Sequence, residues 1–253
     1  MLQILYQDDD LVAINKPPNL LVHRTKIDKH ETRFAMQELR NQIGQYVYPV
    51  HRLDKPTSGV LLFALSSDIA TRITALFESG RVQKKYLAVV RGVTDIRGVV
   101  DYALKEQLDK MTDEQAVQNK SAQAATTVYE RIAQIELDIP VGPYSTSRYS
   151  LLQLMPETGR KHQIRRHMKH IFHPVIGDTT HGDGKHNSMF RSQFNCHRLL
   201  LHAYSLHFPH PVSEKSIYLN AKLDEIFAEI INRFHWSAAL QFDETTLPTE
   251  KHC

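Results

Sequence analysis

The chain has 253 residues, of which 42% are hydrophobic, so it carries enough apolar material for one large domain or two small ones. The formal net charge of +3 is too small to indicate a nucleic-acid partner by itself, and two cysteines do not make a disulfide framework. No apolar run reaches membrane-spanning length, and the opening residues lack the pattern of a signal peptide. We therefore expect a cytoplasmic protein without a membrane segment.

The first forty residues predict a hairpin followed by a helix. Residues 2–6 and 11–15 read as two strands, and three acids at 8–10 form the turn between them. Between residues 31 and 43 the apolar positions recur at helical spacing, and Gly44 is suited to end that helix.

The segment that dominates the sequence is residues 51–59, which read H-R-L-D-K-P-T-S-G and precede an apolar run at 60–65. Such a run predicts a buried central strand, so the polar segment before it lies at a sheet edge. Proline and glycine constrain the backbone there, which presents Asp54 on a fixed loop. A purely structural alternative is that Asp54 caps the turn through an Asx-type hydrogen bond.

The middle of the chain predicts a helix and three strands. Ser67 is a candidate cap for a helix that runs to about residue 79 and ends at Gly80. A strand carrying Tyr86 follows, and residues 93–123 read as a solvated excursion. Residues 124–135 and 147–155 alternate as strands of an antiparallel sheet do.

A basic segment at 159–167, G-R-K-H-Q-I-R-R-H, predicts a helix that opens near Gly159. Ile164 and Met168 fall on its inner face, while Arg165 lies at the margin and is expected to be partly buried, so that it needs an anion. The outer face and the helix start carry a run of one sign, which favours contact with an RNA backbone; these positions are Arg160, Lys161, His162, Arg166 and Lys169.

The rest of the chain adds closing elements. Residues 216–219 predict a strand, residues 223–234 an amphipathic helix, and residues 237–253 a polar, frayed tail. Four histidines crowd residues 162–173, but neither they nor Cys196 have the spacing of a zinc site, so we expect no metal.

Taken together, these segments resemble the RluA family of pseudouridine synthases. The family's H-R-L-D-x-x-T-S-G block stands at 51–59, its K-x-Y block at 84–86 and its G-R-x-H-Q-[IL]-R-x-H block at 159–167. An R-L-x-L-H-A strand matches residues 198–203, and a K-P-x-G-x-x-V-H turn matches 16–23, with Asn19 in the glycine position. Lys161 stands where most of the family has Thr and matches the branch that modifies tRNA.

The resemblance implies a fold and a set of roles. It implies an α+β fold with one catalytic domain over residues 1–236, a mixed, mainly antiparallel sheet, flanking helices and a central cleft, without an added N-terminal RNA-binding module. Asp54 is implied as the catalytic acid, Arg165 as its partner and Tyr86 as the ring against the target base. Arg52 fills the gap that a flipped base leaves, and Leu53, Thr57 and Leu201 line the pocket.

The implied reaction explains these residue types. Converting uridine to pseudouridine breaks the bond from base to ribose, turns the uracil and joins its C5 to the same sugar carbon. It needs no oxidant or hydrolysis, so we expect no cofactor. Asp54 must be ionised whether it attacks the sugar, adds to the base or assists loss of a ribose proton through a glycal, and a cation beside it favours that form.

The implied partner is RNA, specifically a T-stem uridine of tRNA bordering the acceptor stem, and we expect a monomer without an obligate protein partner. Two alternatives remain at this stage. One is a related enzyme that acts on ribosomal RNA, and the other is a non-catalytic RNA-binding factor built on the same basic helix.

Overall fold

The computed structural model describes residues 1–23, 31–105 and 121–243. In these ranges one mixed sheet runs in the order β1-β2-β4-β9-β5-β8-β7-β6, with β3 beside β4 and β10 beside β9. The strands are β1 Gln3–Gln7, β2 Leu11–Lys16, β3 Tyr48–Pro49, β4 Ser58–Ala64, β5 Gln83–Arg91, β6 Arg97–Asp101, β7 Thr126–Leu137, β8 Ser147–Pro156, β9 Leu201–Pro209 and β10 Ser216–Asn220.

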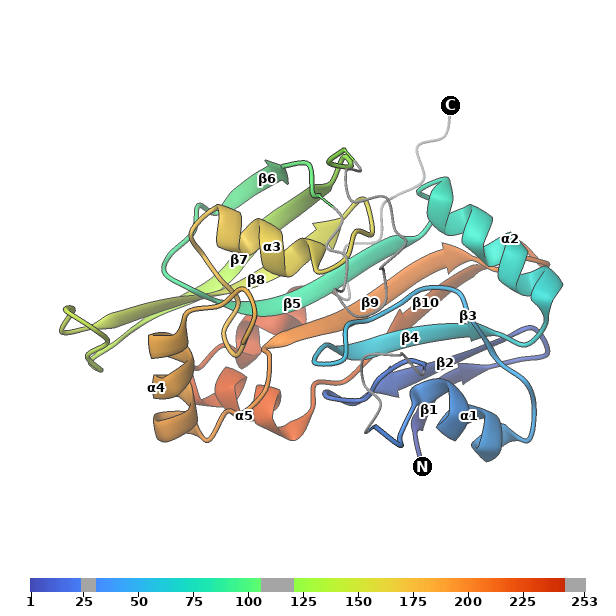
Figure 1. The fold of residues 1–253 in the computed structure, drawn as a ribbon, viewed down its shortest axis with the longest axis horizontal. Coiled ribbons are helices and arrows are strands. Elements are labelled where there is room, and N and C mark those ends of the chain that lie inside the picture. Colours follow the sequence, from blue (N-terminus) through green and yellow to red (C-terminus); the bar gives the residue numbers. More distant parts are fainter. Residues whose placement is uncertain (24–30, 106–120, 244–253) are drawn as a thin grey trace.

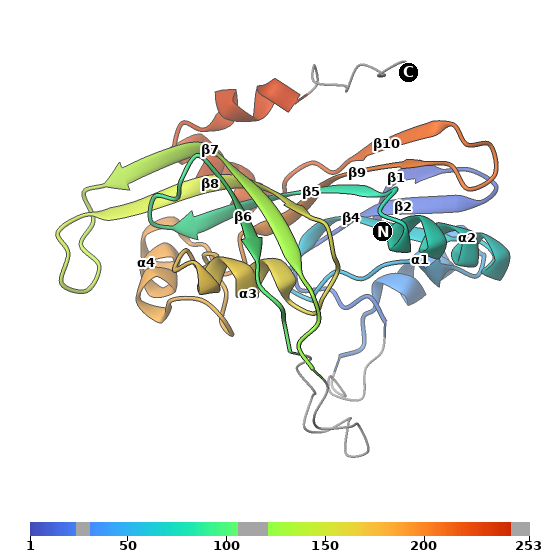
Figure 2. The ribbon, with the colours of Figure 1, turned by 90° about the horizontal axis from the view of Figure 1, so that it is seen from above.

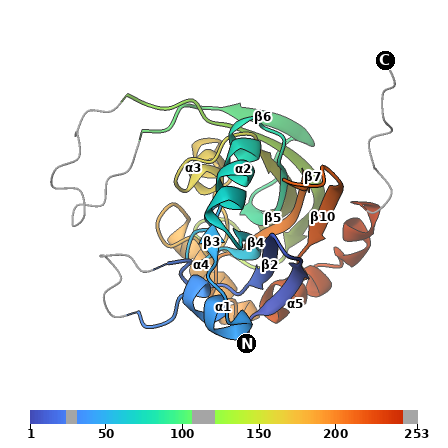
Figure 3. The same ribbon diagram turned by 90° about the vertical axis from the view of Figure 1, so that its right-hand side faces the viewer.

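Five α-helices and one 3₁₀-helix accompany the described part of this sheet. The helices α1 and α2 lie beside the half that contains β1 to β4, whereas α3, α4 and α5 lie around the other half (Figure 1). Seen from two other directions, α3 and α5 lie on opposite sides of the sheet (Figures 2 and 3). The helix bounds are α1 Ala35–Ile43, α2 Ser67–Glu78, α3 Gln163–His170, α4 Gly184–Phe194, α5 Glu225–Arg233 and the 3₁₀-helix η1 Ser237–Asp243.

The strand β4 is buried over its whole length, as the apolar run predicted. Successive side chains of a strand point to opposite faces, so its alternate residues enter two different clusters. Leu61 and Phe63 pack with α1, whereas Val60 and Leu62 pack with α2. Because apolar side chains cover both faces, a shift of β4 by one residue would exchange the residues that pack with α1 and those that pack with α2.

The pairing of β4 with β9 joins the two halves of the sheet and is parallel, in contrast to the antiparallel pairs around it. It extends over Ser58 and Gly59, which lie opposite His202 and Ala203. Beneath it, the guanidinium of Arg198 donates to the Ser58 hydroxyl oxygen over 3.0 Å, and Ser58 Oγ lies 2.7 Å from His202 Nδ1. This buried polar network fixes the edge from which the loop of Asp54 departs.

Several elements differ from the sequence prediction at their ends. The first helix begins at Ala35 rather than near residue 31, and Ser66, not Ser67, caps α2 by accepting from the Ile69 N–H. Both differences arise because Ser, Thr and charged residues are also common just outside a helix, so periodicity places the start poorly. Gly44 does end the first helix in a left-handed conformation, and Asn19 adopts one too, with φ of 62°.

Larger differences lie in the second half of the chain. The excursion predicted for 93–123 contains β6, which pairs with β7, and residues 106–120 lie outside the described ranges. The basic helix begins at Gln163, four residues later than predicted, and α4 was not predicted at all. The predicted tail begins with η1, where Leu240 packs on the cluster that holds Trp236; residues 244–253 are not described.

No helix in the described ranges is both long enough and apolar enough to cross a membrane.

We predict that Gly59→Ala lowers the free energy of unfolding by more than about 2 kcal/mol. Its φ of +114° disfavours any side chain, and a Cβ there would lie 2.2 Å from the Ala203 backbone oxygen. Denaturant unfolding measures the change. Gly80→Ala is the matched control, because its φ of +72° is also left-handed while nothing lies within 4 Å of its added Cβ. If both variants lose the same stability, the close approach of β4 to β9 does not add to the cost of a side chain at position 59.

Candidate active site

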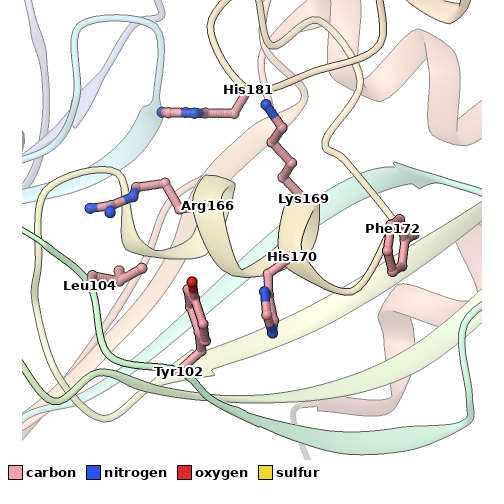
Figure 4. A pocket seen from close by; sticks show the side chains of 7 residues that line it. All are labelled: Tyr102, Leu104, Arg166, Lys169, His170, Phe172 and His181. Atoms are coloured by element: carbon pink, nitrogen blue, oxygen red, sulfur yellow. The ribbon is translucent and has the colours of Figure 1, made fainter. Parts of the chain in front are cut away.

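A cleft of about 770 Å³ lies where the two halves of the sheet meet. Its walls come from the loop before β4, from β5, from the end of α2 and from the segment that leads into α3. Most of the residues singled out from the sequence line it, namely Arg52, Leu53, Asp54, Thr57, Tyr86, Arg160, Lys161, His162, Arg165 and Leu201. Arg166 and Lys169 line a separate, smaller hollow together with His170 and Phe172 (Figure 4).

The centre of the cleft is an arginine held between two carboxylates. Arg165 donates from Nη1 to Oδ2 of Asp54 over 3.0 Å. Its other edge forms a two-pronged bond to Asp178, with Nε and Nη2 at 2.7 Å and 2.9 Å from the two carboxylate oxygens. Since the Arg165 side chain is only 4% exposed and that of Asp178 only 1%, this pair fixes the guanidinium plane. The remaining nitrogen, Nη1, is therefore held in a fixed direction toward Asp54.

In this group each charge favours the ionised form of its partner. Burial by itself lowers the pKa of the Arg165 guanidinium, but its bonds to Asp178 and Asp54 raise it overall. Burial likewise raises the pKa of the Asp178 carboxyl, and the bonds from Arg165 and from the backbone N–H groups of His181 and Thr180 outweigh it, so the net direction is downward. Both partners are therefore ionised at neutral pH.

Asp178 is the functional residue that the sequence prediction missed. It sits in a turn after Val175 and Ile176, and Asn187 from α4 clamps that turn by accepting from the Gly177 N–H and donating to the Asp178 carbonyl. The only signal in the sequence was an acid directly after a glycine, and this pair is also common in turns that carry no function. Its place in the site depends on Arg165, 13 residues earlier, and on α4, a helix that periodicity did not reveal.

The turn that contains Asp54 is closed by a backbone hydrogen bond and not by the Asp54 side chain. The Thr57 N–H bonds to the Asp54 carbonyl over 3.0 Å, which closes the turn, while the carboxylate turns toward Arg165. The Asx-type cap considered from the sequence is therefore not the arrangement in the structure. With the Asp54 side chain 26% exposed, its carboxylate is reachable from the cleft.

Two basic residues, the buried Lys16 and the half-buried His51, anchor the same loop. Lys16 is completely buried, and its ammonium donates to the carbonyls of Pro17, Leu20 and Lys55. Burial lowers the pKa of this amine to about 7, with the nearby Arg198 charge acting in the same direction. His51 accepts from the Leu62 N–H over 3.0 Å, and burial lowers the pKa of its imidazole to about 3, so the ring stays neutral.

Tyr86 reaches the cleft from β5 at a place where the strand is irregular. The register with β9 shifts between Lys85 and Tyr86, and such a bulge redirects the side chains beside it. The ring packs against both the α1 and the α3 clusters. Burial raises the pKa of the Tyr86 hydroxyl, and the Asp54 carboxylate raises it further, so this hydroxyl keeps its proton.

The basic segment before α3 forms a loop and not a first helical turn. The Gln163 side chain holds it, because its carbonyl oxygen accepts from the Thr158 hydroxyl and the Arg160 N–H. Its amide donates to the Thr126 carbonyl and to the Thr127 hydroxyl. The side chain of this one buried glutamine therefore determines the shape of the loop.

His162 therefore does not project from the outer face of the helix, as the sequence predicted. It occupies the residue before α3 with φ of 54°, and its Nδ1 lies 3.0 Å from Nε2 of His181. Its Nε2 lies 3.9 Å from Oδ2 of Asp54. Burial lowers the pKa of both imidazoles, that of His181 to about 4, so two neutral rings stand beside the carboxylate.

No group of three histidine, cysteine or acidic side chains is placed to hold a metal ion within the described ranges. The charged atoms at the centre are instead a carboxylate, a guanidinium and a second carboxylate, with a tyrosine hydroxyl beside them. Such a set can stabilise charge and move protons on a bound ring.

Comparison with known proteins agrees with this geometry. The model of the RNA pseudouridylate synthase family matches residues 10–170. The chain belongs to this family. It is 52% identical over 239 residues to tRNA pseudouridine synthase C of Vibrio parahaemolyticus, covering 94% of this chain and 97% of that one. It is 53% identical over 236 residues to tRNA pseudouridine synthase C of Haemophilus influenzae, covering 93% and 99%.

A solved structure has a similar fold over nearly the whole chain. Human RNA Pseudouridylate Synthase Domain Containing 4 superposes with a TM-score of 0.68 at 27% identity, over 92% of this chain and 93% of that chain. The RNA pseudouridylate synthases are isomerases, so membership assigns this chain to an enzyme class. The stretch matched by the family model contains Asp54, Tyr86 and Arg165 and ends before Asp178.

We predict that Asp178→Asn lowers the free energy of unfolding at neutral pH by about 3 kcal/mol or more, because it leaves most of the buried Arg165 charge uncompensated. Urea unfolding measures this. Asp68→Asn is the control: its pair with Arg72 spans 2.9 Å, but the two side chains are 69% and 53% exposed, so about 0.5 kcal/mol or less is expected.

The same variant tests the direction of the pKa shift. A carboxyl whose pKa is lowered on folding adds stability above its unfolded value of about 4 and loses it as the pH falls. The wild type should therefore lose stability below about pH 4 more steeply than Asp178→Asn. Parallel curves would show that Asp178 is not paired in solution.

Proposed function

We propose that this protein isomerises a uridine of tRNA to pseudouridine, with Asp54 as the catalytic residue. The observation that carries the proposal is the carboxylate of Asp54 held 3.0 Å from a buried arginine at the base of a cleft. A tRNA substrate is supported by the relatives of more than 50% identity over nearly the whole chain, which are named tRNA pseudouridine synthase C. We propose that the target is the T-stem uridine that borders the acceptor stem.

The target nucleotide must leave the stacked RNA before Asp54 can reach its sugar. Extruding a base costs a few kcal/mol, and an aromatic ring beside the extruded base restores about 1–3 kcal/mol. Tyr86 is placed for that stacking, with Leu53, Thr57 and Leu201 closing the pocket around it. Arg52 is exposed at the rim of the cleft, where its side chain fills the space that the base has left.

Arg165 keeps the reacting carboxylate ionised and oriented throughout the reaction. The carboxylate needs a negative charge in each route by which it acts on the nucleoside, and a fixed guanidinium supplies the counter-charge. Because Asp178 holds the other edge of the guanidinium, no reorganisation of Arg165 is needed as charge develops. Tyr86 retains its proton beside this pair, so it acts as a hydrogen-bond donor toward the bound nucleotide.

The RNA backbone enters past the loop that precedes α3. Arg160, Lys161 and His162 line this side of the cleft, and cations there neutralise phosphates on either side of the extruded nucleotide. His23 lies in the same cleft and its buried Nδ1 is without a hydrogen-bond partner within the described part of the chain.

The first prediction from this proposal concerns the substrate and Asp54 together. Purified protein, without any cofactor, should form pseudouridine in an unmodified tRNA transcript, and Asp54→Asn should form none while binding the transcript within about threefold of wild type. Chemical mapping of pseudouridine gives the position, and a filter assay gives the affinity. Modification of ribosomal RNA fragments instead of tRNA would favour the alternative substrate, and unchanged activity of Asp54→Asn would contradict the proposed role.

A second prediction concerns the orientation of the carboxylate. Arg165→Lys keeps the positive charge but cannot bond Asp54 and Asp178 at once, so kcat should fall about a hundredfold through misplacement. Single-turnover kinetics at saturating tRNA measures it. Arg72→Lys is the control, because Arg72 forms an exposed pair on α2 remote from the cleft lining. A turnover for Arg165→Lys within threefold of wild type would rule out a need for the two-sided bond.

A further inference from the structure

The last turn of α3 ends in a residue whose backbone conformation does not suit it. The N–H of Phe172 bonds to the Lys169 carbonyl over 3.0 Å, and the N–H of His173 bonds to the Met168 carbonyl over 2.8 Å. This is the Schellman arrangement, and it leaves Phe172 with φ of 65°, where glycine is strongly favoured. A residue with a side chain is strained there.

Packing does not offset this strain. The Phe172 ring is 78% exposed, so it contributes little apolar burial to the core. A large apolar side chain that is exposed in this conformation carries the cost of the strain and gains no stability from burial. Such a residue is expected where an exposed ring serves a contact with another molecule.

The surroundings of Phe172 are basic and aromatic. Phe172 borders a shallow hollow of about 350 Å³, together with Arg166, Lys169 and His170 (Figure 4). The imidazole of His170 stacks on Tyr102, with the ring centroids 3.8 Å apart. Arg166 donates to the Lys105 carbonyl over 3.0 Å, which orients its guanidinium. No carboxylate lines the hollow among the residues that the structure describes.

The hollow adjoins the cleft of Asp54 through a pair of histidines. Its lining includes His181, which bonds to His162 over 3.0 Å, and His162 lines the cleft. The helix α3 thus presents Arg165 to the cleft and Arg166 to the hollow. A polyanion that enters the cleft near Lys161 can extend over the end of this helix and meet the cations Arg166 and Lys169 and the rings beside them.

We propose that this hollow is a second RNA contact, in which Phe172 stacks on an unpaired base outside the modified nucleotide while Arg166 and Lys169 neutralise the phosphates beside it. The inference rests on the proposed function, because the occupant is the RNA substrate itself. Stacking of one base on an aromatic ring changes affinity by about fivefold to a hundredfold, and each neutralised phosphate adds to the salt dependence.

The test uses substitutions whose effects on stability and on RNA binding have opposite signs. Phe172→Gly relieves the left-handed strain and removes the ring, so its thermal midpoint should rise by about 1–3 °C while KM for the tRNA transcript rises about tenfold. Phe172→Asn, which also tolerates the conformation, should show the same rise in KM. Phe172→Tyr keeps a stacking ring and should retain the wild-type KM. Lys169→Gln should reduce the slope of log affinity against log salt by about one.

Tyr144→Ala provides the matched control, because Tyr144 is another ring that is 71% exposed but lies in the β7–β8 hairpin, outside both linings. If Phe172→Gly gains stability and binds tRNA as tightly as wild type, the inference is wrong. It is also wrong if the wild type self-associates in sedimentation and Phe172→Gly does not, because the ring would then cover a second copy. A wild type that modifies no tRNA contradicts the proposed function instead.

Discussion

The contact between Asp54 and Arg165 joins two segments that lie 111 residues apart, and the two halves of the molecule are arranged around it. The carboxylate comes from the loop before β4, in the first half of the sheet, and the guanidinium comes from α3, which packs on the second half. A single charged pair across such a junction would leave each group free to turn. The second carboxylate, Asp178, removes that freedom, because it fixes one edge of the guanidinium through two hydrogen bonds in a nearly dry environment.

The polar groups behind the cleft extend this support. Lys16 and Arg198 are buried and His51 is half-buried, and each has a backbone carbonyl, a backbone N–H or a hydroxyl as partner. A buried polar group without partners would cost several kcal/mol, so each of these residues is bound to one arrangement of the loop. Their effect on chemistry is indirect: they set where Asp54 stands, and they leave its carboxylate accessible from the cleft.

Phe172 and Gly59 illustrate opposite uses of left-handed backbone. At Gly59 the sheet brings two strands so close that no side chain fits, and the residue without one occupies the position. At Phe172 the backbone has the same handedness, but space is open and a large ring stands there exposed. The first case is explained by packing inside the protein. The second has no explanation in internal packing, and the proposed RNA contact is based on that difference.

The sequence by itself determined the class of the fold, the central strand, the cleft-lining segments and the family, because these depend on local patterns: an apolar run, helical spacing and short blocks of fixed letters. It singled out Asp54, Tyr86 and Arg165, which the structure brings together in one cleft. Only the tertiary structure decided that Asp178 completes the arginine's partners, that His162 turns inward to His181, and that Arg166 and Lys169 line a different surface from Arg160. Each of these depends on where a side chain points after distant segments have packed, and a single positive φ or one helical turn fewer is enough to change it.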